Sequence, residues 1–100
     1  MNSMIRHVVL VKFKSEASQA ERERWLGQLR VLPEKIGFIR SLTVGTDQLH
    51  SQNSYDLALV IDFDSLGAVR EYANHPAHVP VAEFGSTLTQ SRISVDFEIS

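Results

Sequence analysis

The sequence predicts an α+β fold in which four antiparallel strands form one sheet and the helices lie on a single face of it. Two patterns support this prediction. Segments with alternating hydrophobicity and segments with helical spacing of apolar residues follow one another in the order βαββαβ. Cap and breaker residues separate these segments, and no repeat or low-complexity linker interrupts the 100 residues. We therefore expect a single domain over residues 1–100.

The first expected element is a strand over residues 5–14. One of its faces carries a histidine and three apolar side chains: His7, Val9, Val11 and Phe13. The opposite face carries Val8 and Leu10 among basic residues. Apolar atoms therefore occur on both faces of this strand, which is unusual for a strand with one side in water.

A helix is expected next, starting at Ser18. Ser18 and Glu21 match the S-x-x-E capping box, in which the two side chains satisfy free backbone donors at the start of a helix. Apolar residues then recur at helical spacing: Trp25, Leu26, Leu29 and Leu32. Pro33 is expected to end this helix, because proline lacks a backbone N–H.

Two strands follow, expected over residues 38–44 and 55–63, with a polar loop between them. The second of these is the most apolar segment of the chain. One of its faces carries five apolar or aromatic side chains: Tyr55, Leu57, Leu59, Ile61 and Phe63. Its other face carries Ala58 and Val60 between two aspartates.

The last part of the chain predicts helical segments and a final strand. Asp64 or Ser65 can cap a helix on which Tyr72 lies three residues after Val69, toward the buried side. Pro76 is expected to end or kink that helix, and a further short helix is plausible over residues 79–88. A strand over residues 92–99 alternates apolar residues with Ser94, Asp96 and Glu98, and this alternation does not say which set faces the helices.

This order of elements suggests a ferredoxin-like arrangement. Since the helices can cover only one face of the sheet, the apolar residues on the other face would meet water in a monomer: Val8, Leu10, Ala58 and Val60. An uncovered apolar patch of this kind usually marks a partner surface. We therefore expect a homodimer in which the two sheets pack face to face.

Composition excludes several classes of function. Without cysteine, the chain has no disulfide, thiolate nucleophile or Cys-based zinc site. The formal net charge of −2 and the absence of a basic, aromatic strand pattern argue against nucleic acid as a partner. No apolar run approaches the ~18 residues of a membrane helix, so we expect a cytoplasmic protein without membrane association. No ligand set stands at a recognised metal-binding spacing, so neither a metal nor another cofactor is predicted.

Five short blocks together resemble one known family. They are IRHVVLVKFK, VGTD, YDLALVIDFDS, YANHPAH and VDFE, in this order from Ile5 to Glu98. The chain is similar to the stress-responsive A/B barrel (Dabb) family, which implies a ferredoxin-like monomer that pairs into a dimeric α/β barrel. Most bacterial members have no assigned reaction, whereas a plant member is a polyketide cyclase that closes an aromatic ring by aldol condensation without a metal.

The resemblance also implies a set of site residues. The Y-x-x-H-P-x-H stretch of the plant cyclase carries its chemistry, and it maps onto Tyr72 and His78, with His7 and Asp96 as further matches. Leu29 and Leu57 stand where the cyclase has a tyrosine and a histidine, so the substrate is expected to differ. These two leucines, with Val9 and Leu26, are the expected wall of an apolar substrate pocket.

Each candidate has an alternative interpretation. His78 has a side chain that can accept and return a proton near neutral pH, and a carboxylate such as Asp96 could hold its ring. His78 could equally finish a helix by donating to a C-terminal carbonyl, and Tyr72 and His7 could be satisfied core side chains.

Two classes of function therefore remain open. One is a small cofactor-free enzyme that abstracts a proton beside a carbonyl and then cyclises or isomerises the compound, with a small apolar carbonyl compound as ligand. The other is a stress-associated or ligand-binding dimer without catalysis. The position of His78 relative to Tyr72 and to a cavity discriminates between them.

Overall fold

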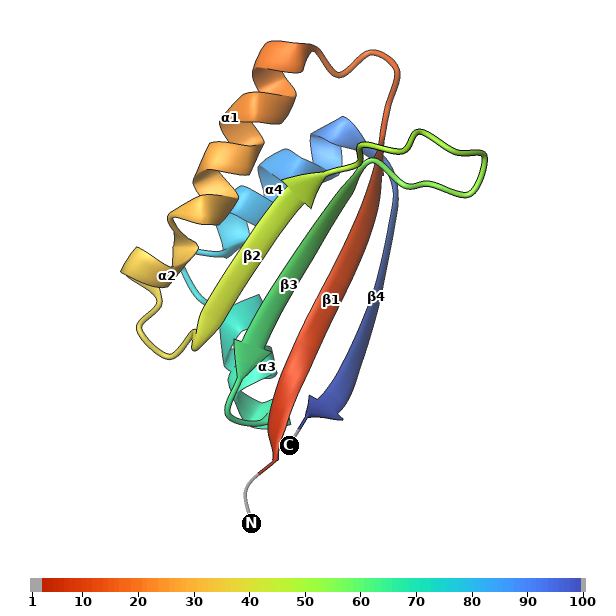
Figure 1. Ribbon diagram of the computed structural model, residues 1–100. Coiled ribbons are helices and arrows are strands. Elements are labelled where there is room, and N and C mark those ends of the chain that lie inside the picture. The colour runs from red at the N-terminus through yellow and green to blue at the C-terminus, as the bar shows by residue number, and fades with distance from the viewer. Residues whose placement is uncertain (1–2, 100) are drawn as a thin grey trace.

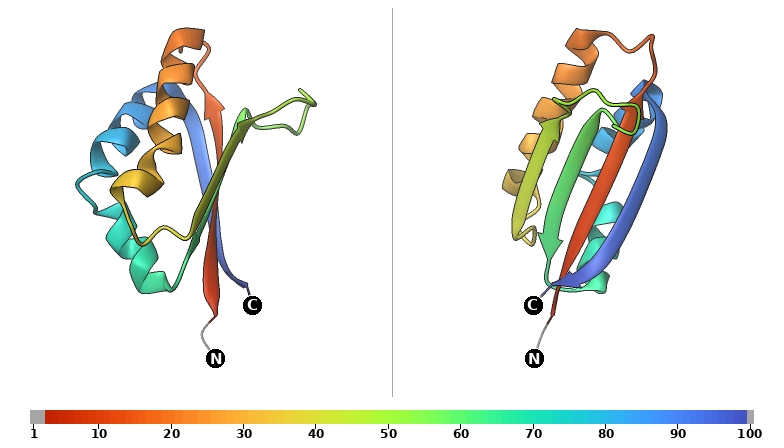
Figure 2. Two further views of the ribbon diagram at one scale, coloured as in Figure 1. Left: turned by 60° about the vertical axis from the view of Figure 1, so that its left-hand side comes forward. Right: turned by 45° about the vertical axis from the view of Figure 1, so that its right-hand side comes forward.

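The computed structural model describes residues 3–99, which form one four-stranded antiparallel sheet with helices on one face (Figure 1). The strands are β1 (Met4–Phe13), β2 (Ser41–Thr46), β3 (Leu57–Phe63) and β4 (Thr89–Ile99), in the spatial order β2-β3-β1-β4. The helices are α1 (Gln19–Arg30), α2 (Leu32–Lys35), α3 (Leu66–Ala73) and α4 (Val79–Leu88). The predicted α+β class and ferredoxin-like order are confirmed, and Figure 2 shows the opposite face of the sheet bare.

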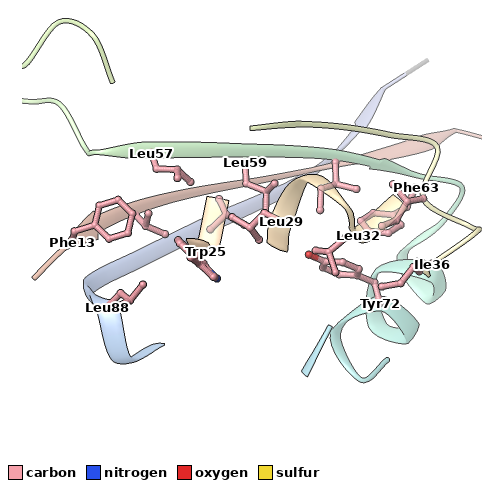
Figure 3. Packing of buried hydrophobic residues seen from close by; sticks show 14 of the residues in the cluster. Phe13, Trp25, Leu29, Leu32, Ile36, Leu57, Leu59, Phe63, Tyr72 and Leu88 are labelled. Atoms are coloured by element: carbon pink, nitrogen blue, oxygen red, sulfur yellow. The ribbon is translucent and has the colours of Figure 1, made fainter. Parts of the chain in front are cut away.

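The hydrophobic core fills the space between the sheet and the helices. Its largest fully buried side chains come from β1, β3 and the α2 region: Phe63, Leu32, Ile36, Ile61 and Val11. Figure 3 shows Trp25 and Leu29 of α1 in the same cluster as Leu57 and Leu59 of β3. The helix-facing sides of β1 and β3 are therefore the sides that alternation predicted to be apolar.

The predicted helix signals occur where the sequence placed them, with one change. Ser18 Oγ accepts from Glu21 N–H at 3.1 Å and Glu21 Oε1 accepts from Ser18 N–H at 3.0 Å, which completes the capping box. The helix α1 ends at Arg30, and Pro33 lies in the first turn of the short helix α2. Proline fits there because the first turn of a helix needs no internal N–H donor.

Four predicted strand boundaries are wrong by two or three residues. Two of them are the end of β2, at Thr46 and not at Val44, and the start of β4, at Thr89 and not at Arg92. β2 begins at Ser41 and not at Phe38, whose ring packs against Phe63 with centroids 6.4 Å apart. β3 begins at Leu57 and not at Tyr55. The later start of β3 is explained by Asp56, whose carboxylate accepts from the Phe13 backbone N–H at 2.7 Å and so replaces a ladder hydrogen bond.

The pairing of β1 with β4 settles which side of β4 faces the helices. His7 pairs with Asp96, Val9 with Ser94 and Val11 with Arg92. Residues directly opposite in an antiparallel pair share one face of the sheet. The polar set of β4 therefore lies on the helix side, in line with the inner face of β1.

The apolar set of β4 lies on the bare face. Ile93, Val95 and Phe97 are 48%, 55% and 43% exposed, respectively. They stand beside the half-buried Val8 and Leu10 of β1, since Leu10 pairs with Ile93 and Val8 with Val95. The apolar outer face that the sequence predicted is thus present, and β4 extends it.

Candidate active site

A cavity of about 230 Å³ opens between the inner face of the sheet and the helices α1, α3 and α4. Most of its wall is apolar, and its polar side chains gather toward β4 and the end of α3: His7, Tyr72, His78, Arg92 and Ser94. A volume below the ~300–1,000 Å³ of drug-sized sites indicates room for a small ligand. The polar part of the wall includes Arg92 and Ser94 because β4 turns its polar residues toward the helices.

Tyr72 reaches this cavity from the last turn of α3, on the buried side that its spacing from Val69 predicted. The residue is 3% exposed, and its ring packs against Phe63 with centroids 5.1 Å apart. Burial raises the pKa of the Tyr72 phenol well above its ordinary value, so the hydroxyl stays protonated. Within residues 3–99, no protein group hydrogen-bonds this hydroxyl, which leaves it free to donate to a ligand.

His78 lies immediately beside Tyr72. The two ring centroids are 4.2 Å apart, and His78 Nδ1 lies 3.1 Å from the carbonyl oxygen of Ala73, the last residue of α3. Because a carbonyl only accepts, Nδ1 must carry the proton in this contact, and Nε2 of the neutral ring then holds a free lone pair. The alternative interpretation, that His78 donates to the C-terminal carbonyl of a helix, therefore matches this contact, and the capping bond selects the tautomer.

The charge state of His78 follows from its surroundings. Burial is the main cause that lowers the pKa of His78 below its ordinary value, and Arg92 and His7 add to the effect. The hydrogen bond to Ala73 opposes it. At neutral pH the ring is thus mostly uncharged, which is the form a base requires.

His7 and Asp96 form a pair of their own. His7 Nδ1 and Asp96 Oδ1 are 2.5 Å apart, with their side chains 16% and 29% exposed. The hypothesis that Asp96 holds the His78 ring is wrong, because the β1–β4 register places Asp96 directly opposite His7. His7 in turn contacts Tyr72 edge-on, with ring centroids 6.1 Å apart, so the pair adjoins the same cavity.

Three of the four predicted wall residues line the cavity. Val9, Leu29 and Leu57 do so, whereas Leu26 lies along a separate polar hollow beside Asp47 and Asp56. The reason is helical geometry. Leu29 is four residues after Trp25 and lies on the same face of the helix, whereas Leu26 is rotated by ~100° from Trp25. Leu26 is therefore not part of this candidate site.

Sequence reasoning missed three side chains of the cavity wall. The sequence identifies Trp25 only as one of the apolar residues at helical spacing, but it forms part of the wall while its Nε1 donates to Val81 O at 3.0 Å. Arg92 and Ser94 were not singled out at all, although they share the parity of Asp96 on β4. That shared parity was the available signal, and it needed only the knowledge that the Asp96 side faces the helices.

Together these groups can perform acid–base chemistry on a ligand. The neighbouring Tyr72 and His78 have pKa values shifted in opposite directions, which keeps one protonated and the other unprotonated at pH 7. Among residues 3–99, no cluster of three or more His, Asp or Glu side chains has the arrangement of a metal site. In the same residues, every helix is too short or too polar to span a bilayer.

A family comparison matches almost the entire chain. The family described as Stress responsive A/B Barrel Domain, or Dabb, matches residues 5–99. The chain belongs to this family. The resemblance inferred from five short sequence blocks is thereby confirmed.

Individual relatives of this Dabb domain differ in what is known of them. Olivetolic acid cyclase of Cannabis sativa is 23% identical over 95 residues, covering 93% of this chain and 94% of the cyclase. A dimeric ferredoxin-like protein of unknown function from Bacteroides fragilis is 31% identical, with 96% of each chain covered and a TM-score of 0.81. Hydroxynitrile lyase from Passiflora edulis reaches a TM-score of 0.89 at 16% identity over 100% of this chain and 96% of the lyase. The last likeness concerns the fold alone.

Proposed function

We propose that this Dabb protein binds a small carbonyl compound and catalyses cofactor-free proton abstraction beside the carbonyl, followed by cyclisation or isomerisation. The observation that carries the proposal is the contact of Tyr72 and His78 at the wall of a largely apolar cavity, with ring centroids 4.2 Å apart. One of these groups is a free hydrogen-bond donor and the other a neutral base. The similarity to a cyclase supports the same class of chemistry.

The proposed first step uses both groups. His78 Nε2 takes a proton from the carbon next to the carbonyl, and the C–H electron pair forms the carbon–carbon double bond of an enolate. Negative charge develops on the carbonyl oxygen, where the Tyr72 hydroxyl donates a hydrogen bond to it. The capping bond from His78 Nδ1 to Ala73 O stabilises the imidazolium that forms, in the place where other enzymes use a carboxylate.

In the proposed second step, the enolate carbon attacks another carbonyl carbon of the same molecule. A carbon–carbon bond forms, the electron pair of the attacked C=O moves to its oxygen, and that oxygen receives the proton from His78 Nε2. Loss of water, in which the new hydroxyl and a neighbouring hydrogen leave, then gives the unsaturated ring. If no second carbonyl is within reach, return of the proton to a different carbon isomerises the compound instead. Both outcomes leave the protein unchanged.

Proton abstraction can be tested separately from ring closure. Exchange of the α-protons of a β-diketone for deuterium, followed by NMR, measures the first step, and loss of water from a linear β-triketone, followed by mass spectrometry, measures the second. His78→Ala should reduce exchange by roughly 10²–10⁴-fold, the typical contribution of a general base. Tyr72→Phe should reduce it by roughly 10²–10³-fold, the typical cost of removing one oxyanion donor.

The matched control is His75→Ala. His75 stands in the same connection and its Nδ1 also makes a backbone hydrogen bond, accepting from Ala77 N–H at 3.0 Å, but it does not line the cavity. This variant should therefore keep the exchange rate of the parent, provided that circular dichroism shows all three variants folded. If the parent binds the diketone but exchanges its protons no faster than buffer does, the protein is a ligand-binding dimer without catalysis.

We further propose that the chain forms a homodimer through the bare face of its sheet. Three exposed apolar side chains of β4 and the half-buried Val8, Leu10 and Val60 form one continuous apolar surface there. Such a surface is expected to be covered in solution. The 31% identical relative that is described as dimeric supports the same conclusion for this chain. Sedimentation at micromolar concentration should give twice the chain mass of 11.3 kDa, and a stable monomer would contradict the proposal.

A further inference from the structure

Arg92 is a cavity residue to which the proposed chemistry assigns no role. Arg92 lies on β4 two residues before Ser94, and its pairing with Val11 places it on the helix-facing side of the sheet. Its side chain lines the cavity and is also exposed to solvent. A residue that both lines the cavity and is exposed lies at its mouth, so Arg92 borders the apolar interior.

The charge of Arg92 is not balanced inside the protein. Three other arginines have internal partners: Arg6 donates to Asp62, Arg40 to Asp64 and Arg22 to two backbone carbonyls. Within residues 3–99, Arg92 forms no ion pair, and no carboxylate lines the cavity. Asp96, the nearest acid along the strand on that face, is already bonded to His7.

The unbalanced charge acts on the two groups of the proposed reaction. Arg92 is close enough that its charge lowers the pKa of both Tyr72 and His78, although burial dominates the pKa of each. A cation thus faces a cavity that contains a phenol, two histidines and otherwise mainly apolar side chains. The electric field in this cavity favours an anion.

We propose that the ligand is a carbonyl compound that also carries a carboxylate, a keto acid, and that Arg92 binds this carboxylate at the mouth of the cavity. This inference rests on the proposed function for the place of the carbonyl beside Tyr72, but the anion-binding role of Arg92 stands on the cavity alone. A guanidinium matches a carboxylate with two parallel hydrogen bonds, and the Ser94 hydroxyl adds a donor on the same strand face. The two contacts hold the compound in one orientation.

This orientation explains how a small site can be selective. With the carboxylate held at the mouth, the apolar part of the ligand lies toward Leu29, Leu57 and Leu59, where no polar group competes for it. A neutral analogue of the same size gains the apolar contacts but leaves Arg92 without a partner. Hydrogen bonds to charged groups are worth enough to make such an analogue bind roughly tenfold or more weakly.

The test compares levulinate, a small keto acid, with methyl levulinate, which differs by loss of the charge. Affinity is measured by NMR titration of the 100-residue chain, and exchange of the α-protons for deuterium is measured on the same two compounds. The parent should prefer levulinate by at least about tenfold in affinity. Arg92→Gln should abolish this preference and leave the affinity for methyl levulinate nearly unchanged, because glutamine keeps much of the side-chain length without the charge.

The matched control is Arg70→Gln. Arg70 is an exposed arginine of α3 outside the cavity, so its substitution makes the same change in net charge and should keep the preference for levulinate. A second readout follows the imidazole resonances of His78. Levulinate should raise the pKa of His78 by neutralising Arg92, and methyl levulinate should not.

The outcomes separate this inference from the proposed reaction. If Arg92→Gln binds levulinate as tightly as the parent does, or if Arg70→Gln loses the preference equally, the inference is overturned. If levulinate binds through Arg92 but its protons do not exchange above the buffer rate, the anion site stands and the proposed catalysis fails. If methyl levulinate binds as tightly and exchanges as fast as levulinate in the parent and in Arg92→Gln, the catalysis stands and the anion site fails.

Discussion

Gly85 of α4 allows the Trp25 indole to form one wall of the cavity, and replacing this glycine with alanine tests that packing directly. A Cβ built on Gly85 would lie 2.4 Å from Trp25 Cζ2, 2.5 Å from Cε2 and 2.8 Å from Nε1. Real Cβ contacts essentially never fall below 3.0 Å. Trp25 is 4% exposed and its ring is rigid, so the indole must move as a unit by about 1 Å to restore ordinary contact.

The cost of that movement can be estimated from its parts. Overpacking a close-packed site costs about 1–3 kcal/mol, and the hydrogen bond from Trp25 Nε1 to Val81 O contributes a further ~0.5–1.5 kcal/mol that the shift puts at risk. The better helix propensity of alanine returns ~1 kcal/mol. We therefore expect Gly85→Ala to lower the free energy of unfolding by about 0.5–3.5 kcal/mol.

Gly27→Ala is the matched control. Gly27 lies in α1, is exposed, and a Cβ there would meet no atom within 4 Å. This substitution should raise the free energy of unfolding by about 0.5–1 kcal/mol through helix propensity alone. The contrast in sign between the two glycines depends only on the position of Trp25.

Urea unfolding of both variants, followed by Trp25 fluorescence and by circular dichroism, measures the two effects. The midpoint should move down for Gly85→Ala and up for Gly27→Ala at unchanged slope. The Gly85 variant should also bind ligand more weakly, because the displaced indole enters the cavity. A Gly85→Ala protein as stable as the parent or more so would refute the assigned packing of Trp25 on α4.

Three further predictions concern the interface and the titrating groups. Val60→Asp should shift the proposed dimer toward monomer, because it places an unpaired charge on the apolar sheet face; sedimentation measures it, with unchanged circular dichroism as the control. Burial lowers the pKa of His78, so below the ordinary value of 6.5 the unfolded state binds more protons than the folded state does. The contribution of His78 to stability should therefore be fully present above pH 6.5 and decrease as the pH falls below it. In urea titrations at several pH values, His78→Gln should flatten this dependence. The hydrogen bonds from Arg6 lower the pKa of Asp62, so the stabilisation they provide is present above the ordinary pKa of 3.8 and is lost as the pH falls below that value. Asp62→Asn should therefore lower the free energy of unfolding more at pH 7 than at pH 2. An equal loss at both pH values would contradict this pairing.

Local patterns in the sequence were sufficient for the elements and for part of the site. The alternation of β1 and β3, the capping box at Ser18 and the helical spacing before Pro76 each act within about ten residues, so they can be recognised without knowledge of the fold. The place of Tyr72 on the buried side of α3 follows from the same local rule. The apolar content of both faces of β1 also indicated that one face would remain bare.

The contacts that define the site depended on the tertiary structure. An alternating strand such as β4 is the same sequence whichever side faces the helices, so only its pairing with β1 could place Arg92 and Ser94 in the cavity and Asp96 against His7. Likewise, the sequence of the helix that contains Leu26 and Leu29 does not determine which of the two lines the cavity. In the folded protein Leu29 does so. His78 acquired its tautomer from the carbonyl of Ala73 because the chain folds back after α3. Such contacts form between segments that are far apart in the sequence. The register of these segments is set by the packing of the whole core and not by any local run of residues.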